Sequence, residues 1–267
     1  MPLFLEYWFW LVVISAGCFL LERLAPWRRQ QRLFRRGWAQ DLFWLVFNGH
    51  YFGLLFALLI GDLALGIPAA ERVRLLEGTP FLLQFFIVLV VKDIVEYGIH
   101  WLLHNVPFLW EFHKLHHSIE ELDWIGNFRF HWVEVLIYKT LSYLPLVILG
   151  ADWRVLFAIG VLWTVMLDLN HSNLNYSWGP LRYLLNSPRM HVWHHDFELH
   201  HRGGQNFGQV LSVWDWLFGT AYWPNDRTMP ERLGFKGMEN YPTGILGRLF
   251  WPLSALIRPR VRHEKSD

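Results

Sequence analysis

The sequence predicts an all-α integral membrane protein in which four to five membrane-embedded helices carry a histidine-rich cap on the cytoplasmic side. Three observations predict this fold. Apolar residues (AVILMFWYC) make up 53% of the 267 residues and charged residues 18%. The apolar residues come in runs long enough to cross a bilayer. The 14 histidines are clustered rather than scattered. We expect a single membrane domain over residues 1–267.

The composition excludes several other classes of protein. The formal net charge is +1, without the basic excess typical of nucleic-acid-binding domains, so we expect no nucleic-acid partner. A disordered chain is excluded because it could not contain so much apolar surface. The single cysteine, Cys18, excludes a disulfide scaffold, a cysteine-ligated zinc site and a cysteine-held iron–sulfur cluster.

The first apolar run covers residues 5–21 and is interrupted only by Glu6. It is long enough to cross the hydrocarbon core as a helix. A secretory signal peptide needs positive charges ahead of its apolar stretch, and no Lys or Arg precedes Glu22. Residues 15–18 (Ser-Ala-Gly-Cys) faintly resemble a lipoprotein cleavage site, but the same missing charges argue against cleavage. We therefore expect an uncleaved span.

Four further apolar runs are predicted to form helices. They cover about residues 42–60, 80–91, 133–149 and 155–169. The run at 80–91 continues as a helix to His104. The last two runs are joined by a short turn at 150–152, so they form a hairpin. Both are close to the lower length limit for a crossing, and a re-entrant hairpin or buried core helices are the alternative for them.

Basic residues predict the orientation of the spans. Six arginines lie between the first two runs: Arg23, Arg28, Arg29, Arg32, Arg35 and Arg36. The loop at 61–79 has only Arg72 and Arg74, beside acidic residues. The positive-inside rule places the arginine-rich loop in the cytoplasm. Counting spans from this loop brings every histidine cluster to the cytoplasmic face, where the polar and aromatic chain from Ser172 onward would form the cap.

Three histidine clusters have the spacing of metal ligands. They are His100 and His104; His113, His116 and His117; and His191, His194 and His195. Residues three or four apart on a helix share a face, so each His-x-x-His-His sequence can offer up to three imidazoles to one centre. Two such sequences are not expected by chance in a chain of this composition. Because imidazole is the commonest metal ligand, we interpret the clusters as a metal site.

The number of histidines indicates the metal. Eight are about twice as many as one ion needs, so two metal ions are predicted. Without thiolates, two non-haem irons for oxygen chemistry fit best, and zinc could occupy the same ligands in a purified sample. Asp93 and Glu96 share a helical face with His100, and Asp168 stands in the same relation to His171. We expect these carboxylates to accept the second ring N–H of a ligating histidine, with salt bridges or solvation as the alternative.

These motifs resemble the fatty acid hydroxylase / sterol desaturase superfamily of membrane non-haem iron oxidoreductases. The resemblance runs from about Asp93 to Pro224. Residues 93–104 are similar to the family's Asp-x6-His-x3-His stretch. The two His-x-x-His-His sequences match its histidine boxes. Residues 128–134 (Phe-Arg-Phe-His-Trp-Val-Glu) resemble its Arg-x-His-Pro-x-Glu segment, with Trp132 where proline is usual. Residues 171–173, 206–208 and 214–220 resemble further family motifs.

The resemblance implies a catalytic core at about residues 80–224 that performs O2-dependent hydroxylation or desaturation of a lipid. It implies two iron ions held by nine histidines: His100, His104, His113, His116, His117, His171, His191, His194 and His195. It also makes Asp93 and Asn206 the candidate catalytic residues. Trp101, where many relatives have arginine, changes the expected substrate contacts rather than the ligands. The sequence has no dinucleotide fingerprint or cysteine cluster, so electrons are expected from a separate donor protein.

Two other functions are compatible with these motifs. A carotenoid or ether-lipid monooxygenase would use the same centre. A non-enzymatic membrane protein could bind metal, or haem between two histidines, but haem leaves the adjacent pairs at 116–117 and 194–195 unexplained. His131 is compatible with a structural or a site role. The remaining histidines, His50, His200, His201 and His263, fit no ligand spacing.

Overall fold

The computed structural model describes residues 4, 6–52, 73–224 and 228–257, and every regular element in these ranges is helical. The elements before the cap are α1 (Tyr7–Leu24), α2 (Trp38–Val46), η2 (Phe47–Phe52), α4 (Phe81–Asn105), α5 (Pro107–His117), η4 (Trp124–Phe128), α6 (Trp132–Ile148) and α7 (Trp153–His171). The cap contains η5 (Gly179–Tyr183), α8 (Pro188–His194), α9 (Val213–Phe218), η6 (Met238–Asn240) and α10 (Ile245–Ile257). The predicted all-helical fold is therefore confirmed for the described ranges.

Two of the described helices, α1 and α7, are long and apolar enough to cross a membrane. The run predicted at 42–60 corresponds in part to α2 and η2, and its remainder lies outside the described residues. The helix predicted from residue 80 to His104 is α4, which is 25 residues long but buries Lys92, Asp93 and Glu96. The hairpin predicted at 133–169 is formed by α6 and α7 around Gly150, which has a positive φ of 79°.

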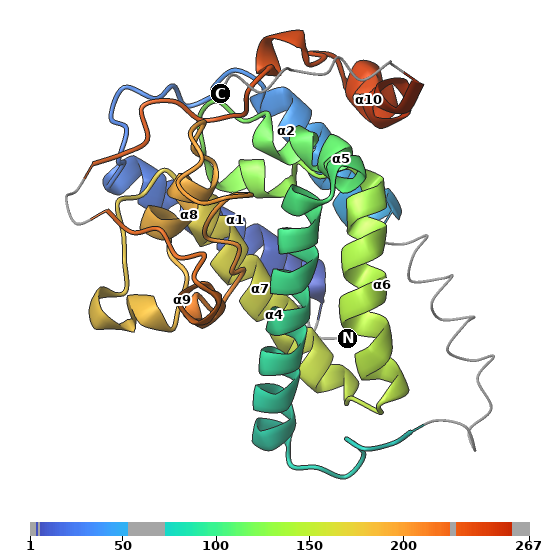
Figure 1. Ribbon diagram of the computed structural model, residues 1–267. Coiled ribbons are helices and arrows are strands. Elements are labelled where there is room, and N and C mark those ends of the chain that lie inside the picture. Colours follow the sequence, from blue (N-terminus) through green and yellow to red (C-terminus); the bar gives the residue numbers. More distant parts are fainter. Residues whose placement is uncertain (1–3, 5, 53–72, 225–227, 258–267) are drawn as a thin grey trace.

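The long helices form a bundle in which α4 contacts both α6 and α7, and α1 packs against α7 (Figure 1). Apolar side chains such as Val88, Leu146 and Ile159 are fully buried in the core of the α4–α6–α7 part. On the other side of α7, the hydroxyl of Tyr7 lies 2.5 Å from the hydroxyl of Thr164, and Ser15 donates to Asp168 at 3.0 Å. These contacts fix α1 against the C-terminal half of α7.

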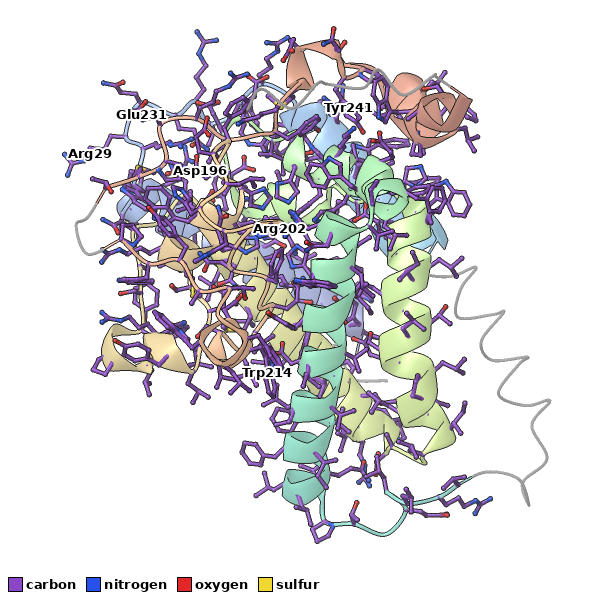
Figure 2. The ribbon with its side chains drawn as sticks, viewed as in Figure 1. Arg29, Asp196, Arg202, Trp214, Glu231 and Tyr241 are labelled. Carbon is purple, nitrogen blue, oxygen red and sulfur yellow. The ribbon has the colours of Figure 1, made fainter. Side chains whose placement is uncertain are left out.

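The cap covers one end of this bundle, with α10 lying across its edge (Figure 1). Asp93 on α4 holds the cap because its carboxylate accepts the backbone N–H of Val210 at 3.0 Å and of Leu211 at 3.1 Å. It also accepts the indole N–H of Trp214 at 2.8 Å, and Figure 2 shows Trp214 beside α4. The cap is thereby tied to the helix that carries His100 and His104.

Candidate metal centre

Nine histidine side chains converge where α4, α5, α7 and α8 meet, and they form two groups. The five-histidine group consists of His100, His104, His113, His117 and His194, and the four-histidine group consists of His116, His171, His191 and His195. Within each group the potential ligand nitrogens all lie within 4.8 Å of one another. The structure therefore brings together all nine histidines that the sequence indicated.

The two groups adjoin each other. In the four-histidine group, Nε2 of His171 lies 3.2 Å from Nε2 of His116 and 3.1 Å from Nε2 of His191. In the five-histidine group, Nε2 of His117 lies 3.0 Å from Nε2 of His194. Between the two groups, the rings of His113 and His116, which lie three residues apart on α5, have their centroids 5.2 Å apart. The arrangement suits two ions in neighbouring sites.

Local sequence explains how the helices direct the rings. The residue before a proline avoids helical backbone angles, and Val106, before Pro107, is extended with φ −99° and ψ 112°. The chain therefore turns between α4 and α5, so that the histidines of α5 can contact those at the end of α4. Pro188 begins α8 in the same way, at a position where the missing N–H costs nothing.

The second ring nitrogen of five histidines has a hydrogen-bond partner outside the two groups. Backbone oxygens serve four of them: Phe207 O for His100 at 2.8 Å, Arg129 O for His116 at 3.3 Å, Leu167 O for His171 at 2.9 Å and Gln205 O for His194 at 2.8 Å. For His113 the partner is the carboxylate of Glu134 at 2.6 Å. A ring that donates from Nδ1 keeps the lone pair of Nε2 for a metal.

Orphaned nitrogens show that the site fits a metal. The buried Nε2 atoms of His100, His104 and His113 have no hydrogen-bond partner among the described residues. Buried polar atoms without partners are rare, and each needs an explanation such as a bound ion. Burial also lowers the pKa of the histidines on α5 and α8 well below 6.5, with a further contribution from neighbouring imidazoles. These rings are therefore neutral, which is the form that binds metals.

The prediction that Asp93, Glu96 and Asp168 accept a ring N–H of a ligating histidine is wrong. Asp93 holds the cap backbone, whereas Glu96 pairs with Lys92 at 2.5 Å and Asp168 accepts from Ser15 and Asn127. None of these three contacts a ring nitrogen of the nine histidines in the ranges that the structure describes. The carboxylate that does so, Glu134, was noticed only as part of the motif at 128–134. It comes from a different helix, so no spacing rule connects it with His113.

The two remaining site candidates have structural contacts. Asn206 has a positive φ of 56°, and its side-chain amide donates to Met190 O and Tyr222 O, both at 2.9 Å. It thus joins α8 to the loop after α9. His131 begins α6: its Nδ1 accepts the backbone N–H of Val133 at 3.2 Å, which is a helix-capping role. Trp101 is 41% exposed and therefore lies on the outer surface of α4.

Cavities approach the two histidine groups from different sides. The cap cavity, of about 220 Å³, is lined by His104, His117 and His194 together with cap residues. Two adjoining cavities of about 180 and 440 Å³ are lined mainly by residues of α4, α6 and α7, and we call them the helix cavity. Phe130 lines both parts and stacks on His116, with 4.4 Å between ring centroids and 9° between planes. Phe130 thus separates the helix cavity from the four-histidine group.

A helical bundle that ends in two adjoining groups of buried imidazoles is suited to binding metal. The chain belongs to the fatty acid hydroxylase family, whose model matches residues 85–220, and the resemblance stated from the motifs is thereby confirmed. No solved structure matches the chain.

Three relatives illustrate the range of the family. The chain is 34% identical over 186 residues to ornithine lipid hydroxylase OlsE of Rhizobium tropici, which covers 70% of this chain and 55% of the relative. It is 29% identical over 148 residues to fatty acid hydroxylase vlmA of Lecanicillium sp, covering 49% and 40%. It is 27% identical over 145 residues to human alkylglycerol monooxygenase, covering 51% and 30%. The chain thus spans at most about half of the length of these relatives.

Proposed function

We propose that this protein is an O2-dependent lipid hydroxylase or desaturase that uses a histidine-ligated di-iron centre at the cytoplasmic face of the membrane. The observation that carries the proposal is the pair of adjoining histidine groups with their orphaned nitrogens. Membership of the fatty acid hydroxylase family supports the chemistry. The centre would act on a lipid because it lies at the end of an apolar helical bundle.

The nine histidines would hold the two ions, one in each group. When bound, iron would supply the oxidising power that no side chain has. The protein would supply neutral ligands, their orientation and a cavity that excludes water. Zinc is compatible with the same nitrogens, so the metal found after purification depends on supply.

The helix cavity is the proposed site of the lipid chain. Its lining is mostly apolar, and its inner end is Phe130 against His116. A chain lying in this cavity would bring a carbon atom next to the four-histidine group. Substitution of Phe130 by a smaller residue would let the chain reach further, so Phe130 would influence which carbon is attacked.

Asp93 and Asn206 are proposed as positioning residues rather than groups that touch the substrate. Asp93 accepts backbone N–H groups of the cap, and Asn206 joins α8 to the segment at 220–222. Between these anchors lies Phe207, whose carbonyl accepts from His100. Both residues would therefore act on the reaction through the orientation of histidine rings.

We further propose four to five membrane-embedded helices with the cap in the cytoplasm. The outward side of α4 supports its embedding, since Leu82, Phe86 and Val90 are 68%, 59% and 44% exposed. Large apolar side chains on an outer face are suited to lipid contact. Electrons would come from a separate donor protein that approaches the cap.

The names of the relatives indicate amphiphilic lipids as the first substrates to test. An ether lipid is one of them, because human alkylglycerol monooxygenase is among the similar proteins. In the deciding experiment, iron-loaded protein, a reductase system and membrane lipids are incubated with isotopically labelled O2. Label in a lipid hydroxyl group is expected for hydroxylation, and label only in water together with a new double bond for desaturation.

The control for this experiment is His191→Ala, which should abolish the product. If neither product forms from amino-acid, fatty-acyl, sterol, carotenoid or ether lipids with an active reductase, the oxygenase proposal is wrong. An optical spectrum with a haem Soret band would instead support the haem alternative.

A further inference from the structure

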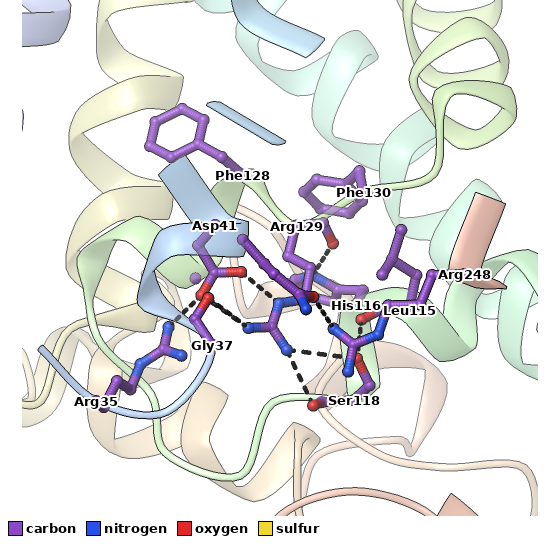
Figure 3. A network of polar contacts seen from close by, with 12 residues as sticks. Arg35, Gly37, Asp41, Leu115, His116, Ser118, Phe128, Arg129, Phe130 and Arg248 are labelled. Carbon is purple, nitrogen blue, oxygen red and sulfur yellow. Dashed lines mark hydrogen bonds and ion pairs between the residues drawn. The ribbon is translucent and has the colours of Figure 1, made fainter. Parts of the chain in front are cut away.

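A small polar cavity of about 130 Å³ lies between the start of α2, the end of α5 and α10. Its lining consists of Arg36, Gly37, Gln40, Ser118, Glu120, Arg129, Thr243 and Arg248. Three of these side chains are guanidinium groups and only one is a carboxylate. Figure 3 shows Arg129 and Arg248 together in this region, so the cavity has an excess of positive charge.

Arg129 belongs to a buried ion network that occupies Asp41 and Asp123, so Glu120 is the one carboxylate in the lining of the cavity. Its guanidinium donates to both carboxylate oxygens of Asp41, which is fully buried, with Nη2 at 2.9 Å from Oδ2. Asp41 also accepts from Nη2 of Arg35 at 2.6 Å, and the same Nη2 lies 2.5 Å from Asp123. Asp41 is therefore shared between the two buried arginines, and Asp123 is paired with Arg35.

Arg248 has only neutral acceptors. It is 9% exposed, and it donates to the carbonyl of Pro242 and to the side-chain oxygen of Gln40, both at 2.8 Å. No acidic side chain of the described residues forms an ion pair with it or with the exposed Arg36. Burial lowers the pKa of Arg248 to about 10, and the charge of Arg129 adds to this effect. A bound anion would relieve the repulsion.

The outer face of α10 indicates where this cavity lies relative to a membrane. Leu246, Phe250 and Leu253 are 70%, 61% and 56% exposed, and their spacing of four and three residues places them on one side of the helix. Arg248 lies on the opposite side, toward the cavity. A helix with an apolar outer face and a basic inner face lies in the plane of the interface, with its apolar side in the acyl region. The cavity would then be at the level of the lipid headgroups.

We propose that the cavity between α2 and α10 binds the phosphate group of an anionic phospholipid. Arg248 and Arg36 would donate to the phosphate oxygens, and the acyl chains would follow the apolar face of α10. The guanidinium of Arg129, which also lines the cavity, would add positive charge. Its backbone oxygen already accepts from His116 at 3.3 Å. This lipid would be a structural ligand, distinct from any substrate in the helix cavity, and its binding does not depend on the proposed oxidation.

The test uses the full chain in phosphatidylcholine nanodiscs, titrated with phosphatidylglycerol that carries a spin label on an acyl chain. Arg248→Gln should weaken binding by about tenfold or more, since it removes hydrogen bonds to a charged group. Arg248→Lys should recover part of the affinity. Arg36→Gln, at an exposed position that tolerates change, should weaken binding by about two- to fivefold. The matched control is Arg154→Gln, an exposed arginine in the first turn of α7, which should have no effect.

Two results would overturn the proposal. One is unchanged lipid binding in both Arg248→Gln and Arg36→Gln. The other is binding of inorganic phosphate that depends on Arg248 while phosphatidylglycerol does not bind, because the site would then take a free anion. Metal content, measured on the same samples, shows whether a variant has lost its fold rather than its lipid.

Discussion

The carboxylate oxygen Oε2 of Glu134 lies 2.6 Å from Nδ1 of His113, and both side chains are fully buried. The other hydrogen-bonded rings of the two groups use backbone oxygens, which carry no charge. Glu134 is therefore the one carboxylate that contacts the histidine groups in the described parts of the chain. A carboxylate in this position would fix the orientation of the His113 ring and, when ionised, strengthen its ligating nitrogen.

We predict that Glu134→Ala lowers metal affinity by about 10- to 100-fold, the usual effect of removing the partner of a ligating histidine. Glu134→Gln keeps an acceptor oxygen and should lose less. Metal content after dialysis against a chelator series measures both effects. Glu239→Gln, at an exposed position, is the control. Equal metal retention by Glu134→Ala and the unchanged protein would contradict a role for the carboxylate.

The two histidine groups should empty separately. His117→Ala removes a nitrogen of the five-histidine group and His191→Ala one of the four-histidine group. Each variant should retain about half of the bound metal, because the other group keeps all its nitrogens. Elemental analysis of protein made in iron-rich medium gives the stoichiometry, with His201→Ala as the control. Complete loss of metal from both variants would show a single cooperative centre instead.

Asp41 should be essential for stability. It is fully buried and accepts from Arg35 and Arg129, so Asp41→Asn leaves the buried Arg129 without its charge partner and leaves Arg35 with Asp123 alone. We expect a loss of about 3–5 kcal/mol, as for other broken buried ion pairs. Asp152→Asn is the matched control, because that carboxylate pairs with the exposed Arg154, and the loss there should be small since exposed ion pairs contribute little. Denaturation in detergent measures both, and similar losses would contradict the prediction.

His131 should make the folded state sensitive to acid. Burial lowers its pKa below the ordinary 6.5, and its Nδ1 accepts from the N–H of Val133. As the pH falls below about 6.5, the unfolded chain binds the proton first, so stability is lost by at most about 1.4 kcal/mol per pH unit. Asparagine also caps helices but does not titrate.

The test compares the metal-loaded protein with His131→Asn, because bound metal suppresses titration of the other histidines. The denaturation midpoints should converge as the pH falls from 7 to 5. Parallel pH profiles for the two proteins would show that His131 does not titrate in the expected way.

The proposed topology can be tested by labelling single cysteines in intact cells. Glu120 is exposed in the segment after α5, and Glu77 is exposed in the loop before α4. A cysteine at 120 should resist an impermeant thiol reagent, whereas a cysteine at 77 should react. The native Cys18 is buried and gives little background. Labelling at 120 but not at 77 would reverse the orientation.

The histidine groups could be predicted from the sequence because their spacing is local. Each His-x-x-His-His lies on one helix, so a single periodicity places its rings on one face. His171 required the family resemblance, since its partners in the four-histidine group lie 20 and 55 residues away. The backbone oxygens that orient the rings have no sequence signature, because every residue has a carbonyl group.

Charged residues were harder to interpret. In the sequence Arg35 is one of six arginines that predict the orientation of the spans, yet it is 3% exposed and pairs with Asp41 and Asp123. The partners come from different parts of the chain, so only the folded structure reveals the network. In the same way, Lys92 and Glu96 are a buried pair at 2.5 Å, and the ammonium group of Lys92 lies over the ring of Trp163 on another helix.

The packing of α1 against α7 has a consequence for biosynthesis. Ser15 and Asp168, which are hydrogen-bonded, are separated by 153 residues in the chain. At typical rates of translation, the ribosome needs roughly 8–30 s to make the intervening segment. With the proposed topology, α1 would remain in the translocation machinery or in the lipid during this time, without its partner helix. Release of the nascent chain before α7 has been made would leave α1 as an isolated apolar helix, and such fragments are expected to be substrates for membrane quality-control proteases.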